Sequence, residues 1–203
     1  TYSVVVNDNN GCITTETVVI TESASLTSSY TQSDYNGFGV SCNGDTDGSI
    51  DLTVTGGVDN ENYTYAWSNT STSEDLNGLG AGTYSVVVND NNGCNTSEII
   101  IITEADPLTS SFTTTDWNGF EIQCNGADNG EIVLNVLGGV TGQPYSYTID
   151  GLSHPSNIFS NITSGTYFIS STDVNGCVTS EIVTMTEPAT AITSSYTQSD
   201  YNG

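Results

Sequence analysis

Apolar and polar residues alternate along much of this chain of 203 residues. Ile, Leu and Val occupy every second position of 50–54 and again of 132–136, and aromatic residues do so over 63–67. Tyr and Val follow the same alternation over 84–88. A period of two predicts β-strands with one buried face, and neither repeat contains a convincing helical pattern.

Two apolar runs break the alternation. Residues 99–102 are four consecutive Ile, and 182–185 read Ile-Val-Thr-Met. Such runs predict strands that are buried on both faces or lie at a covered edge. Gly pairs at 56–57 and 138–139, with Asn- and Asp-rich turns elsewhere, separate the predicted strands. Short strands joined by turns of this kind predict an antiparallel β-sandwich.

The whole pattern recurs after about 82 residues. Residues 1–12 return letter for letter as 83–94, and 27–37 return as 193–203. A fixed period of this length predicts one small domain per repeat. We therefore expect an all-β chain of tandem immunoglobulin-like sandwiches, cut from a longer array. Its predicted parts are the end of one repeat (1–25), two complete repeats (26–107 and 108–190) and the start of another (191–203).

Charge narrows the possible functions. The chain has no Lys or Arg and 24 Asp plus Glu, which gives a formal net charge of −24. Nothing in it can neutralise phosphates, so nucleic acid is excluded and an anionic membrane surface is disfavoured. The sequence contains no apolar run of 18 residues, so we expect no direct membrane insertion. Without Lys or Arg the chain also lacks the groups for Schiff-base chemistry and for most oxyanion stabilisation. We therefore do not expect the protein to be an enzyme.

One short motif precedes a predicted strand in both repeats. Leu79–Tyr84 and Ile162–Tyr167 read apolar-x-x-Gly-x-Tyr. This spacing predicts that Tyr84 and Tyr167 form tyrosine corners, in which the hydroxyl binds the backbone upstream; a plain buried Tyr is the alternative. His154 is the chain's single histidine, lies in a predicted inserted loop and is expected at the surface.

Five cysteines follow the same period, namely Cys12, Cys42, Cys94, Cys124 and Cys177. Regularly spaced pairs in an acidic chain of this type indicate disulfides and an oxidising compartment. A zinc site is less favoured, because it needs four ligands close together and only one His is available.

The pairing has two solutions. We expect Cys42 to join Cys94 and Cys124 to join Cys177, each bridge adding roughly 4 kcal/mol by the loop-entropy model. The partner of Cys12 would then precede residue 1. In the alternative, Cys42 bonds a cysteine of a neighbouring repeat, because the two positions within one sandwich lie at opposite poles. The bridges would then link the repeats lengthwise.

A turn after Cys42 is a candidate calcium site. Asn43, Asp45, Asp47 and Asp51 place oxygen atoms at mostly alternate positions, as the start of an EF-hand loop does. The terminal bidentate Glu of such a loop is missing, and the second repeat loses the acidic residues at the third and fifth positions of the run. Alternatively, a turn rich in Asn and Asp explains the run in both repeats without a bound metal.

An aromatic motif occurs in both repeats: Tyr35 and Phe38 in the first, Trp117 and Phe120 in the second. A third copy begins at Tyr201. We expect these residues to contact the neighbouring repeat. If exposed, they could instead stack on the sugar rings of a surface polysaccharide.

Several of these motifs together resemble the SprB repeat. The resemblance rests on Cys42-Asn-Gly with Asp-Gly-Ser-Ile-Asp-Leu-Thr-Val-Thr-Gly-Gly after it, on Tyr63-Thr-Tyr-Ala-Trp-Ser, and on Asn89-Asp-Asn-Asn-Gly-Cys94. The second repeat departs from this pattern, with Ile149 in place of Trp67 and an inserted His154-Pro155. Both whole repeats and both partial ones share the resemblance.

The resemblance implies a role at the cell surface. SprB repeats build the long stalks of giant adhesins in Bacteroidota, including gliding-motility adhesins exported by the type IX secretion system. It therefore implies an extracellular, non-catalytic, disulfide-stabilised stalk or filament, whose partners are neighbouring repeats or further copies of itself. The alternative is a carbohydrate-binding repeat that uses the aromatic motif. The family supplies no ligand.

Overall fold

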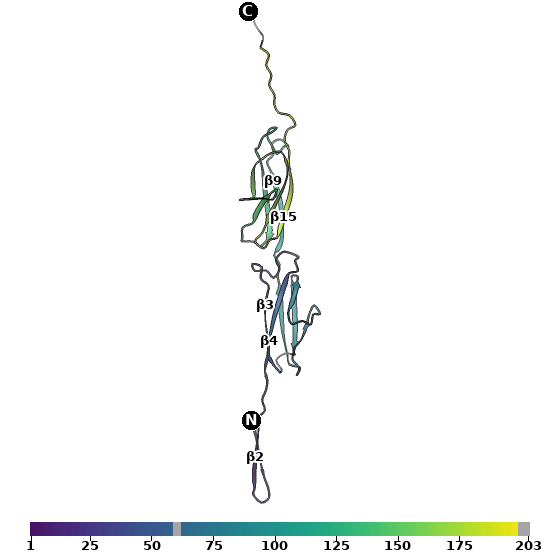
Figure 1. Ribbon diagram of the computed structural model, residues 1–203, viewed down its shortest axis with the longest axis vertical. Coiled ribbons are helices and arrows are strands. Elements are labelled where there is room, and N and C mark those ends of the chain that lie inside the picture. Colours follow the sequence, from purple (N-terminus) through teal and green to yellow (C-terminus); the bar gives the residue numbers. More distant parts are fainter. Residues whose placement is uncertain (59–61, 199–203) are drawn as a thin grey trace, which may run out of the picture. The chain divides into compact units, whose positions relative to one another are not determined.

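The computed structural model describes residues 1–58 and 62–198, and every regular element in them is a β-strand (Figure 1). None of these residues forms a helix long and apolar enough to cross a membrane. The predicted all-β class is confirmed.

Backbone contacts divide the chain into two compact units. Unit 1 consists of Thr1–Gln32, Ser49–Asn77 and Gly82–Ile101, and unit 2 of Ser33–Gly48, Gly78–Ala81 and Ile102–Gly203. The segment Ser33–Gly48 of the first sequence repeat thus belongs to the same unit as the second repeat. The repeat boundaries inferred from the period stay a prediction.

The second repeat forms a sandwich of two antiparallel sheets. One sheet has the order β13-β10-β9, built from β9 (Asp106–Thr114), β10 (Gly130–Gly139) and β13 (Ile158–Ile162). The other has the order β12-β11-β14-β15, built from β11 (Ser146–Ile149), β12 (Leu152–His154), β14 (Gly165–Thr172) and β15 (Val178–Met185). This arrangement is immunoglobulin-like, as the alternation predicted.

The core of this sandwich comes from the alternating positions. In β10, Ile132 and Leu134 are fully buried, whereas Asn135 is exposed. Burying a side chain of this size contributes roughly 1.5–3 kcal/mol. The same core contains Ile122, Phe159, Ile162, Ile169, Val183 and Met185.

The first repeat has strands of the same kind. One sheet has the order β3-β4-β6, with β3 (Ala24–Gln32), β4 (Gly48–Gly57) and β6 (Leu76–Leu79). The other has the order β5-β7-β8, with β5 (Thr64–Trp67), β7 (Gly82–Asn89) and β8 (Asn95–Ile102). Its buried side chains within unit 1 include Ile50, Leu52, Trp67, Leu76, Val86, Val88 and Ile100.

The apolar run of β8 does not have two buried faces. Ile100 is fully buried, but Ile99 and Ile101 are 69% and 58% exposed. The same holds for β15, where Val183 is buried and Ile182 is 69% exposed. Both strands lie at a sheet edge, and each presents one face to the core and the other to solvent. Of the two predictions for these runs, burial on both faces is therefore wrong, and the position at a sheet edge is confirmed.

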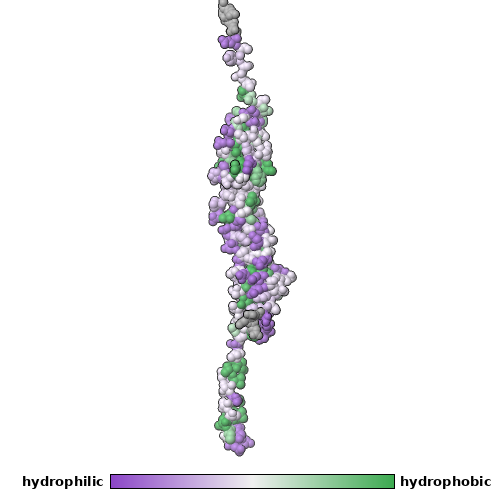
Figure 2. Space-filling view, viewed as in Figure 1, coloured by the Kyte–Doolittle hydropathy of each residue, from purple (hydrophilic) through white to green (hydrophobic). Residues whose placement is uncertain are grey.

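The first residues form a separate hairpin. β1 (Tyr2–Asn7) pairs antiparallel with β2 (Ile13–Val18), and all twelve residues of the two strands are exposed. Apolar residues such as Val5 and Ile13 consequently lie on its surface (Figure 2).

Candidate functional site

One disulfide dominates the chemistry of unit 2. It joins Cys42 to Cys177, which are 135 positions apart in the sequence. Cys12, Cys94 and Cys124 are free and exposed. The favoured pairing within each repeat is therefore wrong, and the alternative, in which Cys42 bonds a cysteine of the neighbouring repeat, describes the structure.

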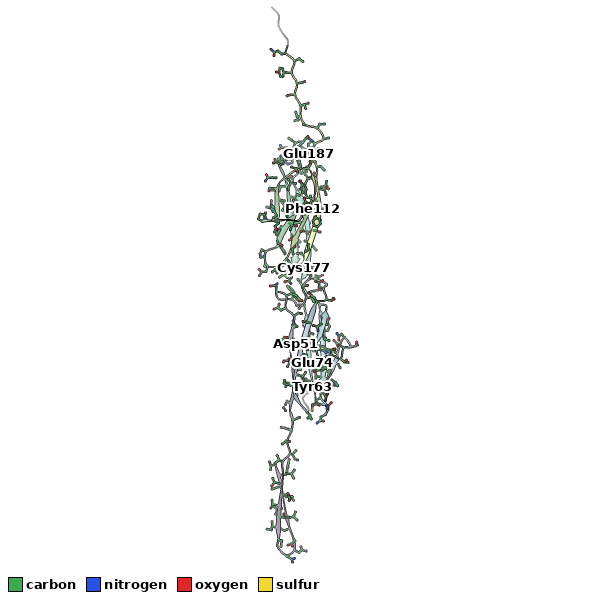
Figure 3. All side chains as sticks on the ribbon, in the orientation of Figure 1. Asp51, Tyr63, Glu74, Phe112, Cys177 and Glu187 are labelled. Atoms are coloured by element: carbon green, nitrogen blue, oxygen red, sulfur yellow. A yellow bond between two sulfur atoms is a disulfide. The ribbon has the colours of Figure 1, made fainter. Side chains whose placement is uncertain are left out.

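The position of the second repeat's cysteines gives the reason. Beside Cys124, the backbone N–H of Gly126 donates to the Glu187 carboxylate at 2.7 Å. Cys177 and Glu187 lie at opposite ends of the second sandwich (Figure 3). Cysteines whose Cα atoms are more than about 7 Å apart cannot form a disulfide without backbone movement, so Cys124 and Cys177 cannot pair within one repeat.

A buried carboxylate shapes the loop that carries Cys177. Asp173 is 6% exposed, and its Oδ1 accepts hydrogen bonds from the N–H groups of Asn175 (2.9 Å) and Cys177 (3.0 Å). Its Oδ2 accepts a third from the N–H of Val140 at 3.0 Å. These bonds fix the conformation of Asp173–Cys177 and hold the cysteine at the end of the sheet.

A tight turn precedes Cys42. Tyr35 and Phe38 pair across Asn36 and Gly37, with 2.7 Å between the Tyr35 nitrogen and the Phe38 carbonyl oxygen. Asn36 and Gly37 have φ angles of 54° and 96°, as a type I′ turn requires, which explains the Asn-Gly pair. The Asp34 carboxylate accepts a further bond from the Gly37 N–H.

Asn175 connects this turn to the Cys177 loop. Its side-chain amide donates to the carbonyl oxygens of Tyr35 and Ser41, both at 3.0 Å. Its Oδ1 accepts a hydrogen bond from the Asn36 side chain. The disulfide is thus accompanied by a hydrogen-bonded contact between residues of consecutive sequence repeats, all within unit 2.

The SprB repeat family model matches residues 40–72 and 121–153, segments that begin shortly before Cys42 and Cys124. The chain carries two SprB repeats. No curated protein matches the chain. A solved structure on the structural basis for Dscam isoform specificity resembles it with 13% identity and a TM-score of 0.29. The likeness covers 69% of this chain and 41% of that one, so this chain spans less than half the length of that structure.

The residues proposed as calcium ligands in the first SprB repeat are occupied by hydrogen bonds. The Asn43 amide donates to the Ala105 carbonyl oxygen at 3.0 Å, and Asp45 accepts from the Ser41 hydroxyl at 2.8 Å. Asp47 accepts from the Ser41 N–H at 3.0 Å, and the Ser41 bonds lower the pKa of Asp47. Asp51 belongs to the other unit.

Calcium binding by these four residues stays a prediction. Across 1–58 and 62–198, no three or more His, Cys, Asp and Glu side chains gather where they could hold a metal ion. The turn after Cys42 is held by its own hydrogen bonds, as the Asx-turn interpretation describes.

The aromatic motif takes the same turn in both sequence repeats. Trp117 and Phe120 pair across Asn118 and Gly119, whose φ angles are 56° and 91°. Trp117 and Phe120 are 42% and 38% exposed, whereas Tyr35 and Phe38 are half-buried. The first copy contacts Asn175 through the Tyr35 carbonyl oxygen and the Asn36 side chain. The third copy, at Tyr201, lies outside the described residues.

The second sequence repeat contains the hydrogen bond of a tyrosine corner. The Tyr167 hydroxyl donates to the carbonyl oxygen of Thr163, four residues upstream, at 3.1 Å. The corner at Tyr84 stays a prediction. His154 is half-buried at the end of β12 rather than in a loop, and its ring lies 4.7 Å from that of Phe159.

Sequence reasoning missed the side chains that complete the site. Asp173 and Asn175 belong to a segment that reads only as a hairpin turn. A signal was present, because an Asp-x-Asn-Gly-Cys segment occurs at 8–12, 90–94 and 173–177, always ending in a cysteine.

Proposed function

We propose that this chain is a non-catalytic spacer in an extracellular stalk or filament at the cell surface. The observation that carries the proposal is the Cys42–Cys177 disulfide, which joins residues of the two consecutive sequence repeats that contain the SprB matches at 40–72 and 121–153. A bond in this position adds a second covalent connection between repeats to the peptide chain itself.

This connection suits a part that transmits tension. Residues 43–176 lie between the two cysteines, so a force that enters at one end of the chain can leave at the other through the disulfide. Most strands of both repeats then lie outside the loaded path. The strands on the loaded path are β1, β2 and β3, before Cys42, and β15, after Cys177.

The composition and chemistry support an extracellular location. Disulfides persist in oxidising compartments and are rare in the cytosol. A net charge of −24 without any Lys or Arg keeps neighbouring copies apart and soluble. The partners that this role requires are neighbouring repeats or further copies of the chain.

Immunogold electron microscopy of intact producing cells tests the proposal. An antibody against this chain should label thin fibres that extend from the cell surface, and a strain that lacks the chain should show neither label nor these fibres. Label confined to the cell interior, or spread over the surface without fibres, would overturn the stalk function.

A further inference from the structure

Two segments of unit 2 meet at the disulfide, the Asp173–Cys177 loop and the Tyr35–Cys42 segment. The loop takes its shape without a disulfide. Asp8 and Asp90 begin loops of the same type, and each carboxylate accepts from the N–H groups two and four residues on, at 2.9 and 2.8 Å. The corresponding distances at Asp173 are 2.9 and 3.0 Å. The loops at Asp8 and Asp90 end in free cysteines, so the carboxylate, and not the bond, shapes the loop.

The other segment also forms without a disulfide, as Cys124 shows. In the turn before each cysteine, 2.7 Å separates the Tyr35 or Trp117 nitrogen from the carbonyl oxygen three residues on. At Cys42 and Cys124 the next Asn amide donates to a carbonyl oxygen at 3.0 and 3.1 Å. The Gly that follows donates its N–H to a Glu carboxylate at 2.6 and 2.7 Å. Because Cys124 is a free thiol, these local hydrogen bonds do not depend on the disulfide.

Asn175 connects the two segments beside the sulfur atoms. Its side-chain amide donates to the carbonyl oxygens of Tyr35 and Ser41, both at 3.0 Å. Asn175 lies two residues before Cys177, and Ser41 directly precedes Cys42, so the bond to Ser41 brings the two cysteines together. Their Cα atoms are 5.7 Å apart, which is a distance at which a disulfide forms.

We infer that the two segments dock before the disulfide exists, and that Asn175 is the residue that positions the Cys177 thiol against Cys42. The docked contact is noncovalent, and the disulfide then makes it permanent. The contact therefore persists when the disulfide is reduced in the absence of force. This inference goes beyond the proposed stalk function, because it concerns how the contact assembles and not where the chain is located.

The covalent step is thiol–disulfide exchange with a small-molecule disulfide such as oxidised glutathione. Cys42 is half-buried and Cys177 is 8% exposed, so the oxidant reaches Cys42 first. The Cys42 thiolate attacks one sulfur of the oxidant and releases one glutathione, which leaves a mixed disulfide. The Cys177 thiolate attacks the Cys42 sulfur and releases the second glutathione. The cysteines are oxidised and the glutathione disulfide is reduced, and the two released thiols carry the two protons that the cysteines lose.

The first experiment measures docking in a chain that cannot form the disulfide. In the full chain with Cys42→Ser, iodoacetamide modifies the remaining thiols, and mass spectrometry of chymotryptic peptides follows each one. Cys177 should react at least about tenfold more slowly than Cys94, because docking buries it, whereas Cys94 ends an equivalent loop and is exposed. Asn175→Ala in the same chain should bring the rate at Cys177 close to the rate at Cys94.

The second experiment measures positioning through the redox equilibrium. The full chain keeps Cys42 and Cys177, and its three free, exposed cysteines are replaced in Cys12→Ser, Cys94→Ser and Cys124→Ser. The chain is equilibrated with reduced and oxidised glutathione and quenched by alkylation. Intact-mass spectrometry then gives the ratio of disulfide to dithiol. This ratio measures how strongly the folded chain holds one thiol at the other.

Three variants of Asn175 and its neighbour separate positioning from general stability. Asn175→Ala should lower the equilibrium constant for disulfide formation by about tenfold, as expected for the loss of one to two hydrogen bonds. Asn175→Asp should lower it further, because a carboxylate of nearly the same size donates nothing and faces two carbonyl oxygens. Val174→Ala, at an exposed position of the same loop, should leave it within about twofold of the parent chain.

Several outcomes would overturn the inference. They are equal alkylation rates at Cys177 and Cys94 in the Cys42→Ser chain, an unchanged equilibrium constant in Asn175→Ala or Asn175→Asp, and an equal loss in Val174→Ala and Asn175→Ala. Labelled surface fibres together with any of these results would leave the proposed stalk function standing and remove the docked contact alone. The expected results in a chain that is absent from the cell surface would do the reverse.

Discussion

At the scale of single residues, the site depends on Asp173. This carboxylate is nearly fully buried, in a chain without Lys or Arg to pair with it, and it is satisfied by three N–H groups. Gly139 leaves room for it, because a Cβ there would lie 2.7 Å from the Asp173 Oδ2 atom. The loop conformation that presents Cys177 therefore follows from one side chain and the space around it.

Replacing Asp173 tests this dependence. Asp173→Ala should lower the free energy of unfolding by about 2–4 kcal/mol, because it leaves buried N–H groups without acceptors. Asp128→Ala makes the same change of charge at an exposed position and should stay within about 0.5 kcal/mol of the wild type. Urea denaturation followed by fluorescence measures both. Equal stability of the two variants would contradict the role of Asp173.

A second residue-scale prediction concerns pH. The Thr186 hydroxyl and N–H bonds to Glu121 lower the pKa of this carboxyl below its ordinary value of 4.5. The folded state then binds its proton less readily than the unfolded state, so Glu121 stabilises the fold above pH 4.5 and loses this effect as the pH falls through its folded pKa. Wild type should exceed Glu121→Gln in stability at pH 7, and the difference should shrink towards zero near pH 3.

Urea midpoints of the two proteins at several pH values give this difference directly. Comparing the pair at each pH removes the contribution of the other carboxyl groups, which both proteins share. A difference that is independent of pH, or that grows in acid, would show that the hydrogen bonds to Glu121 do not favour its charged form.

At the scale of elements, the end of β10 shows how the Gly pair is used. The register with β9 shifts between Leu137 and Gly139, and Gly138 has a φ angle of 82°. A Cβ at Gly138 would lie 1.9 Å from the Pro107 carbonyl oxygen. The strand can therefore bend towards β9 only where a residue without a side chain allows a positive φ and a close approach.

Gly142 offers a matched control for this bend. Its φ angle is 83°, but nothing lies within 4 Å of a Cβ placed there. Gly142→Ala should cost about 1–2 kcal/mol for the left-handed backbone alone. Gly138→Ala adds a clash with backbone atoms and should cost at least about 2 kcal/mol more. Thermal and urea unfolding of the two variants measure the difference, and equal costs would contradict the predicted clash.

At the scale of the whole molecule, the disulfide decides how much chain can be extended by force. With the bond intact, the 135-residue span from Cys42 to Cys177 contributes nothing to the extended length. Breaking the bond frees this span, which corresponds to roughly 450–490 Å of additional contour length at 3.3–3.6 Å per residue.

Single-molecule pulling from both termini measures this length. The wild type should gain the additional contour length only after addition of a reductant, and Cys42→Ser should show it from the start. Cys94→Ser removes a free, exposed thiol and should behave as the wild type does. If Cys42→Ser and wild type extended equally, the bond would not lie on the path of force.

The fold could be predicted from the amino-acid pattern because each strand buries one face. Ile132 and Leu134 take alternate positions on the same face of β10, and any arrangement that buries one buries the other. For β8 the prediction of two buried faces was wrong, because four consecutive Ile show no alternation that distinguishes a buried face from an exposed one. Whether Ile99 and Ile101 are covered depends on which strand lies at the edge of a sheet, and that is a property of the assembled sandwich.

The sequence by itself also determined that every repeat has an equivalent loop and an equivalent pair of cysteines, since identical segments fold alike. It could not choose between bonds within and between repeats. A flexible chain could bring Cys42 to either Cys94 or Cys177, because both sequence separations are long enough to close a loop. Only the tertiary structure decided, because it brings Cys177 to Cys42 and ties the segment after Cys124 to Glu187, at the end of the sandwich opposite Cys177. Disulfide pairing follows distance in space, which the sequence period leaves undetermined.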